Sequence, residues 1–303
     1  MPRTQTVLSM ALLGLGLAAC GDASTGSSSS VAQAPTAAAT QVPACATGSI
    51  KADGSSAIKA LVQKAADEYS AKCPDSTITV AATNSSTGVT KASSGGVDVG
   101  NSDVPVGLVK GVDPKTVVDH PIAIVTFVVA VNPATKVTNL SAKQIQDIFS
   151  GKVTNWKDVG GADLPIAVLE RKPGSGTRLS FDKDLMNGVD ETSNAAQVID
   201  TTQQLIGALP PTPGGVSYLV QSGLKGTTLV PVTIDNHGPA ADNVKTGSYP
   251  FFSHEHCFTS SSPSQLTLSF LQYMQTPGFQ KGTLTAQGYL PLSTTDNQAA
   301  VDK

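Results

Sequence analysis

The sequence contains few charged and few aromatic residues. Of its 303 residues, 14% are charged and 5% are aromatic, whereas globular proteins carry about 25% charged residues. The 20 Lys and Arg residues stand against 23 Asp and Glu residues, so the formal net charge is −3. A surface that holds a nucleic-acid backbone needs an excess of basic side chains. The composition therefore argues against nucleic acid as a partner.

Long hydrophobic runs are also missing. No apolar stretch reaches about 20 residues, the length that a membrane-spanning helix needs, and the mean hydropathy is +0.01. These values exclude a multispanning membrane protein. A hydrophobic fraction of 40% is too high for a wholly disordered chain, and the length suffices for two domains with buried cores.

The first residues have the pattern of an export signal. Arg3 precedes a short apolar stretch at residues 7–19, which has the length of a signal-peptide core. Residues 17–20 (LAAC) resemble a bacterial lipobox, so we expect a signal peptide at 1–19 and lipidation of Cys20. The alternative is an ordinary secretory signal with a chance cysteine. Residues 20–44 are almost only small and polar and predict a flexible tether. We therefore expect an exported protein, in the periplasm or at the cell surface, anchored to a membrane by lipid.

The remaining three cysteines suit an oxidising compartment. Cys45 precedes the first predicted strand, and Cys73 follows the helix that returns from it. Both then lie at one edge of a domain, which favours a Cys45–Cys73 disulfide and leaves Cys257 free and buried. The sequence alone does not prove this pairing.

Short strands and helices alternate from residue 48 onward, which favours an α/β fold with mostly parallel sheets. Two α/β units joined by long extended runs predict two lobes with a ligand cleft between them. We also expect a monomeric protein. We expect lobe 1 at 45–127 plus 251–303, lobe 2 at 128–250, and hinge crossings at 122–131 and 249–258. Strands are predicted at 49–52, 77–82, 97–99, 122–131, 164–169, 216–219 and 229–232, and helices at 57–72, 141–149, 176–186, 201–209 and 266–274.

Four segments place small, hydroxyl or glycine residues where a predicted strand ends and a helix or turn begins. They are residues 53–57, 84–88, 100–103 and 171–177. Unpaired N–H groups at helix starts and at the carboxyl ends of strands bind anions. Each segment taken singly is better explained by helix capping than by ligand binding. The four together, with one arginine and one aspartate, predict an anion site.

Motifs for catalysis and metal binding are incomplete. Residues 171–177 lack the lysine of a nucleotide P-loop and do not supply a nucleophile elbow. Residues 254–257 (HEHC) resemble a metal cluster, but no further ligand stands at a suitable spacing. We therefore expect no enzyme activity, metal or cofactor. Trp156 is expected to fill a hydrophobic gap.

Five motifs together resemble the phosphate-binding proteins of bacterial ABC phosphate importers, in the periplasmic binding protein superfamily. They are GSSA at 54–57, NSSTG at 84–88, VDVGNSDVP at 97–105, VTNW at 153–156 and R-x-x-GSGT at 171–177. The likeness runs from about residue 48 to about 291. It implies two lobes that close on one dehydrated phosphate, which is then delivered to an ABC permease.

The resemblance also implies which residues bind phosphate. The family commonly has an acidic residue where Pro173 stands, and that residue would pair with the arginine, so the orientation of Arg171 is open. By position, the implied ligands are Ser56, Ala57, Ser85, Asp103, Arg171, Ser175, Gly176 and Thr177.

An ionised Asp103 would favour phosphate over sulfate. Phosphate carries a proton that a carboxylate accepts, whereas sulfate would oppose it with a lone pair, and a buried unpaired acceptor costs about 1–3 kcal/mol. Three alternatives remain open: a receptor for sulfate or molybdate, an enzyme acting on phosphate esters, and a surface adhesion or signalling protein. Asp103 could also be a turn-forming residue before Pro105.

Overall fold

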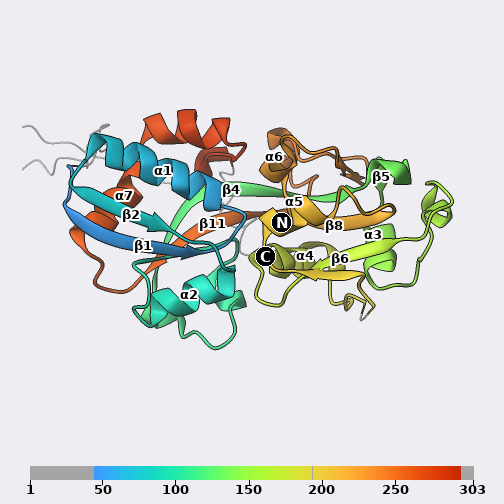
Figure 1. Cartoon of the computed structure of the whole chain (residues 1–303), viewed down its shortest axis with the longest axis horizontal. Helices are drawn as coiled ribbons and strands as arrows, with labels where there is room; N and C mark the ends of the chain where they lie inside the picture. Colours follow the sequence, from blue (N-terminus) through green and yellow to red (C-terminus); the bar gives the residue numbers. More distant parts are fainter. Residues whose placement is uncertain (1–43, 193, 295–303) are drawn as a thin grey trace, which may run out of the picture. The chain divides into compact units, whose positions relative to one another are not determined.

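A computed structural model of the chain describes residues 44–192 and 194–294 (Figure 1). The predicted signal peptide at 1–19, the predicted lipidation site Cys20 and residues 20–43 of the predicted tether lie outside the described residues. Within the described part, every helix is too short or too polar to cross a membrane.

The largest element of the structure is a sheet of nine strands. Its order is β2-β1-β3-β11-β4-β8-β6-β7, and β9 pairs with β4. A separate parallel pair is formed by β5 and β10. The strands are β1 Gly48–Gly54, β2 Ser76–Val80, β3 Val99–Ser102, β4 Val118–Val131, β5 Asn139–Leu140, β6 Ala167–Arg171, β7 Gln197–Ile199, β8 Gly215–Val220, β9 Val230–Pro231, β10 Thr233–Ile234 and β11 Phe252–Thr259.

The sheet is mixed, so the expectation of mostly parallel sheets was wrong for its centre. β1 pairs in parallel with β2 and β3, and β6 with β7 and β8. β4 and β11 run antiparallel to each other and to their outer neighbours. The predicted strand at residues 122–131 lies within β4 and is fully buried there, as a continuous apolar run favours. Such a run does not reveal strand direction.

In residues 44–192 and 194–294, seven α-helices accompany the strands. The predicted helix at 141–149 is observed from Ala142, with a capping box that satisfies the backbone N–H groups of Ser141 and Gln144. The predicted helix at 176–186 ends at Phe181 and continues as one π-helical turn. The helices are α1 Lys59–Lys72, α2 Ser85–Ser93, α3 Ala142–Phe149, α4 Gly176–Phe181, α5 Thr202–Ala208, α6 Ala241–Thr246 and α7 Gln265–Gln275.

The strands divide into two groups, which we call the first and the second lobe. The first lobe contains β1, β2, β3 and β11, with α1 and α7 on one face and α2 on the other (Figure 1). The second lobe contains β6, β7 and β8 with α3, α4 and α5. β4 pairs with β11 over Val118–Thr126 and with β8 over Phe127–Val131, so it passes from one lobe to the other. The two-lobed α/β fold is thereby confirmed; the predicted lobe boundaries stay predictions.

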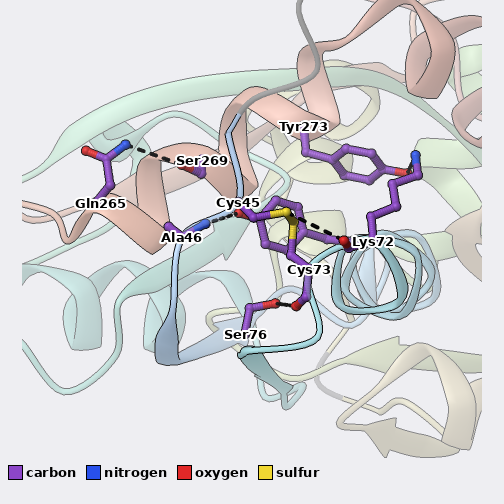
Figure 2. Close-up of a disulfide and its surroundings, with 9 residues drawn as sticks. Cys45, Ala46, Lys72, Cys73, Ser76, Gln265, Ser269 and Tyr273 are labelled. Carbon is purple, nitrogen blue, oxygen red and sulfur yellow. Dashed lines mark hydrogen bonds between the residues drawn. A yellow bond between two sulfur atoms is a disulfide. The ribbon is translucent and has the colours of Figure 1, made fainter.

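Three cysteines and the tryptophan lie in the described part of the chain: two of the cysteines form a disulfide, and the third cysteine and the tryptophan are buried. Cys45 and Cys73 form a disulfide with a Cα–Cα distance of 5.3 Å, between the residues before β1 and the end of α1 (Figure 2). Cys257 is buried and free, and its thiol donates to Asn101 Oδ1 at 3.3 Å. Trp156 is fully buried, with Nε1 donating to the Gly214 carbonyl at 2.9 Å.

Candidate anion-binding site

Asp103 lies at the centre of the polar groups that the two lobes bring together. It follows β3 directly and is 1% exposed. One carboxylate oxygen accepts a hydrogen bond from the Ser55 hydroxyl and the other accepts one from Thr177 Oγ1 at 2.9 Å. Its backbone N–H donates to Ser85 Oγ at 3.1 Å. Burial raises the pKa of Asp103, while the Ser55 and Thr177 hydroxyls and the charge of Arg171 oppose that rise.

Arg171 supplies a buried positive charge at the end of β6. It is 1% exposed, and Nη2 donates to the Asp200 carbonyl at 3.0 Å and to Ser56 Oγ at 3.3 Å. Its Nε and Nη1 atoms are buried without a hydrogen-bond partner. Burial lowers the pKa of the guanidinium and Asp103 counteracts this, and an arginine keeps its charge in proteins. Buried polar groups normally have hydrogen-bond partners, so two unsatisfied donors of a buried, charged guanidinium indicate a site where an anion accepts hydrogen bonds.

Ser56 links the lobes on the other side of the arginine. Its hydroxyl oxygen accepts the Thr202 N–H at 3.0 Å and lies 3.3 Å from Thr202 Oγ1. The backbone N–H of Ala57 donates to Ser55 Oγ at 3.0 Å. The residues before α1 and at the start of α5 therefore meet around Arg171.

The start of α4 approaches the first lobe very closely. A Cβ atom added at Gly176 would lie 2.1 Å from Ser85 Oγ and 2.9 Å from Asp103 Cβ. Only glycine permits this approach, which places Thr177 against Asp103. Ser175 caps α4, its hydroxyl oxygen accepting from a backbone N–H at 3.4 Å. The structure therefore gathers all eight residues implied by the sequence into one region, with Asp103 and Arg171 at its centre.

A second arginine holds the strand that carries Arg171. Arg178 Nη1 donates to the Arg171 carbonyl at 2.5 Å, and the same guanidinium lies 3.4 Å from both Glu170 and Glu191. The Tyr218 hydroxyl donates to Glu191 at 2.9 Å. Burial raises the pKa of Glu191 to about 8, and Arg178 opposes this rise. This network fixes the end of β6 without touching Asp103.

Sequence reasoning missed several groups around the site. Ser55 lies in the candidate segment at 53–57 but is not among the implied ligands, and Thr202 stands in the first turn of the predicted helix at 201–209. Asp200, whose carbonyl anchors Arg171, stands two residues before α5. Glu255 lies against Asp103, and its only signal in the sequence is its place in the HEHC motif.

The HEHC motif lies within β11. The described residues contain no group of three or more His, Cys, Asp or Glu side chains suited to a metal ion. His256 instead pairs with Asp119, with Nδ1 2.8 Å from the carboxylate. Cys257 contacts Asn101, as described above.

A cavity of about 590 Å³ adjoins the site. Ser56, Ala57 and Thr202 form part of its wall, together with Lys59 and Lys225. The cavity therefore combines residues of both lobes with two cationic side chains.

Fold and site together define a two-lobed anion-binding protein. The model of the PBP superfamily domain matches residues 31–277. The phosphate-binding protein PstS of Bacillus subtilis is 37% identical over 248 residues, which are 82% of this chain and 82% of that protein. The chain therefore belongs to the PBP superfamily and, within it, to the family of phosphate-binding proteins.

Solved structures agree with this fold. A substrate-binding protein from Clostridium perfringens, solved with bound phosphate, has a TM-score of 0.73 at 22% identity, over 81% of this chain and 100% of that one. An ABC-type phosphate transport receptor from Vibrio cholerae has a TM-score of 0.65 at 23% identity, over 80% of this chain and 99% of that one. At these identities the likeness concerns the fold.

Proposed function

We propose that this protein captures inorganic phosphate outside the cytoplasm and delivers it to an ABC permease. The observation that carries the proposal is the buried guanidinium of Arg171, which has two unpartnered donors beside the buried acceptor Asp103. Inorganic phosphate can accept from the arginine and donate to the aspartate at once. Its relative in Bacillus subtilis is named a phosphate-binding protein, which supports the same ligand.

The proposed role is binding without chemistry. Closure of two lobes on the anion excludes water, and hydrogen bonds in a dry site are stronger than in water. The groups around Asp103 are hydroxyls, backbone N–H groups and one guanidinium, and the described residues offer no metal cluster. This set binds an anion but includes no activated nucleophile.

Export and lipid anchoring at Cys20 remain part of the proposal. The Cys45–Cys73 disulfide is supported by its geometry and is typical of proteins in oxidising compartments. A protein held near the membrane by a lipid and a tether would keep its ligand close to the permease. We propose that it acts as a monomer.

Calorimetric titration of the purified protein tests the proposed function. Phosphate is expected to bind with a micromolar or lower Kd, whereas sulfate is expected to give a negligible response. Equal affinities would indicate a general oxyanion receptor and contradict the role of Asp103. Titration with a phosphate monoester, followed by assay for released phosphate, separates a binding protein from an esterase.

A further inference from the structure

Glu255 lies behind the acceptor aspartate in the strand pair β3–β11. Antiparallel pairing aligns His256 with Ser102 and Cys257 with Asn101, and the next step of this register aligns Glu255 with Asp103. Side chains directly opposite in an antiparallel pair share a face, with Cβ atoms about 4.5–5.5 Å apart. In the pairing of β11 with β4, the register shifts between Glu255 and His256, and the extra residue there, Ile122, lies on β4.

The surroundings of Glu255 do not suit an ionised carboxylate. The residue is 0% exposed, and neither carboxyl oxygen receives a hydrogen bond from a donor in the described part of the chain. The ionisable groups that face it there are Asp103 from the end of β3, Cys257 from β11 and Tyr289 from the segment after α7. Burial, with the charge of Asp103 next, raises the pKa of Glu255 well above its usual value.

The surroundings of Asp103 stabilise a negative charge better than those of Glu255 do. Two carboxylates in contact in a dry site cannot both ionise, so they hold one proton between them. Asp103 accepts from Ser55 and Thr177 and faces the charge of Arg171. Glu255 has none of these donors, so the proton belongs on Glu255.

We propose that Glu255 is a positioning residue for anion selectivity: its protonated carboxyl donates to Asp103 and keeps that carboxylate ionised and aimed at the ligand. A carboxylate offers about four lone-pair sites. Ser55, Thr177 and the Glu255 hydroxyl fill three of them, and the fourth remains for an O–H of phosphate. Sulfate has no proton for this site. The inference rests on the proposed function, because selectivity has meaning only for a protein that binds phosphate.

Infrared spectroscopy tests the protonation directly. At neutral pH the wild-type protein is expected to show a carbonyl stretch of a protonated carboxylic acid that disappears in Glu255→Gln and persists in Asp103→Asn. Other acids whose pKa is raised, Asp184 and Glu191, are present in the wild type and in both variants, so their bands cancel when one spectrum is subtracted from another. A difference spectrum without such a band overturns the inference, whether or not the protein binds phosphate.

Two substitutions at the same position test the effect on selectivity. Glu255→Gln keeps an N–H donor toward Asp103 and is expected to leave the ratio of phosphate to sulfate affinity within about twofold. Glu255→Met removes the donor and is expected to lower that ratio by about tenfold, since Asp103 then takes up the proton and can donate to sulfate. An unchanged ratio in a folded Glu255→Met protein contradicts the inference.

The outcomes separate this inference from the proposed function. If the wild-type protein binds no phosphate, the proposed function fails while the infrared difference still reports where the proton lies. If Glu255→Gln binds phosphate at least tenfold more tightly than wild type, Glu255 carries a negative charge in the native protein and the inference fails. Thermal unfolding of each variant verifies that it is folded.

Discussion

The two lobes contribute opposite kinds of group to the site. The first lobe presents hydroxyls and two carboxyl groups, Asp103 and Glu255, whereas the second lobe presents the guanidinium of Arg171 and the Thr177 hydroxyl. In the first lobe, the Asp103 carboxylate accepts a hydrogen bond from its neighbour Ser55. In the second, Arg171 keeps two donors without partners. The second lobe is therefore expected to supply most of the attraction for an anion, and the first lobe most of the discrimination between anions.

This division also explains how a protein with a net charge of −3 can bind an anion. The attraction needs one desolvated guanidinium with fixed donors rather than a basic surface, because charge-assisted hydrogen bonds are about twice as strong as neutral ones. The carboxylate of Asp103 opposite the arginine is then expected to select for an anion that carries a proton. Substitutions in the two lobes should therefore change different measured quantities.

The largest expected effect is in the second lobe. Arg171→Met should weaken phosphate binding by about 100-fold or more, because it removes charged donors from a buried site. Calorimetry measures this loss. Lys143→Ala is the matched control, since Lys143 is exposed and pairs with Asp147 on the surface of α3, and it should change the Kd by less than about twofold. A loss below about fivefold for Arg171→Met would show that the attraction comes from elsewhere.

Asp103→Asn tests how much the first lobe contributes to the discrimination between phosphate and sulfate. The amide can donate as well as accept, so sulfate should gain affinity while phosphate loses it, and the ratio should fall by about tenfold or more. Competition between the two anions measures the ratio. Asp67→Asn, on the exposed face of α1, removes the same charge away from the site and should leave the ratio unchanged. If both variants shift it equally, net charge rather than Asp103 sets selectivity.

The sequence was sufficient to predict the fold class, and its motifs name residues that lie together in the structure. Ser85, Asp103 and the residues from Arg171 to Thr177 stand at strand ends, and parallel strands bring such ends to one edge of a sheet. Short motifs with fixed spacing therefore indicated groups that the structure gathers around one centre. The two lobes followed from the alternation of strands and helices.

The remaining groups depend on pairings that no local pattern encodes. Glu255 faces Asp103 only because β11 inserts antiparallel between β3 and β4, and the alternation favoured parallel strands there. Thr202 reaches Ser56 from 146 residues away in the sequence. A run of hydroxyls at a helix start indicates capping in most proteins, so Thr202 gave no signal that set it apart from Thr201.

Thr202→Val tests whether the contact between the lobes supports the arginine. The substitution removes the hydroxyl near Ser56 and keeps the backbone N–H, so the Kd for phosphate should rise by about fivefold, as expected for one hydrogen bond. The ratio of phosphate to sulfate affinity should not change, because Asp103 is untouched. Thr285→Val, at an exposed position, is the control. A change in the ratio would show that Thr202 also contributes to the selection of phosphate over sulfate.

The smallest effect on binding is expected from the disulfide, at the far end of the first lobe. Cys45 and Cys73 lie at the start of β1 and the end of α1, whereas Ser55 and Ser56 lie at the opposite ends of both elements; 14 residues of α1 span about 20 Å. Replacing both cysteines with serine should lower the free energy of unfolding by about 3 kcal/mol, mainly because the unfolded chain gains freedom. The Kd for phosphate should stay within about twofold. Urea unfolding and calorimetry on the same samples measure both quantities. A large loss of affinity would mean that the site depends on the stability of the whole first lobe, rather than on the groups that face the second.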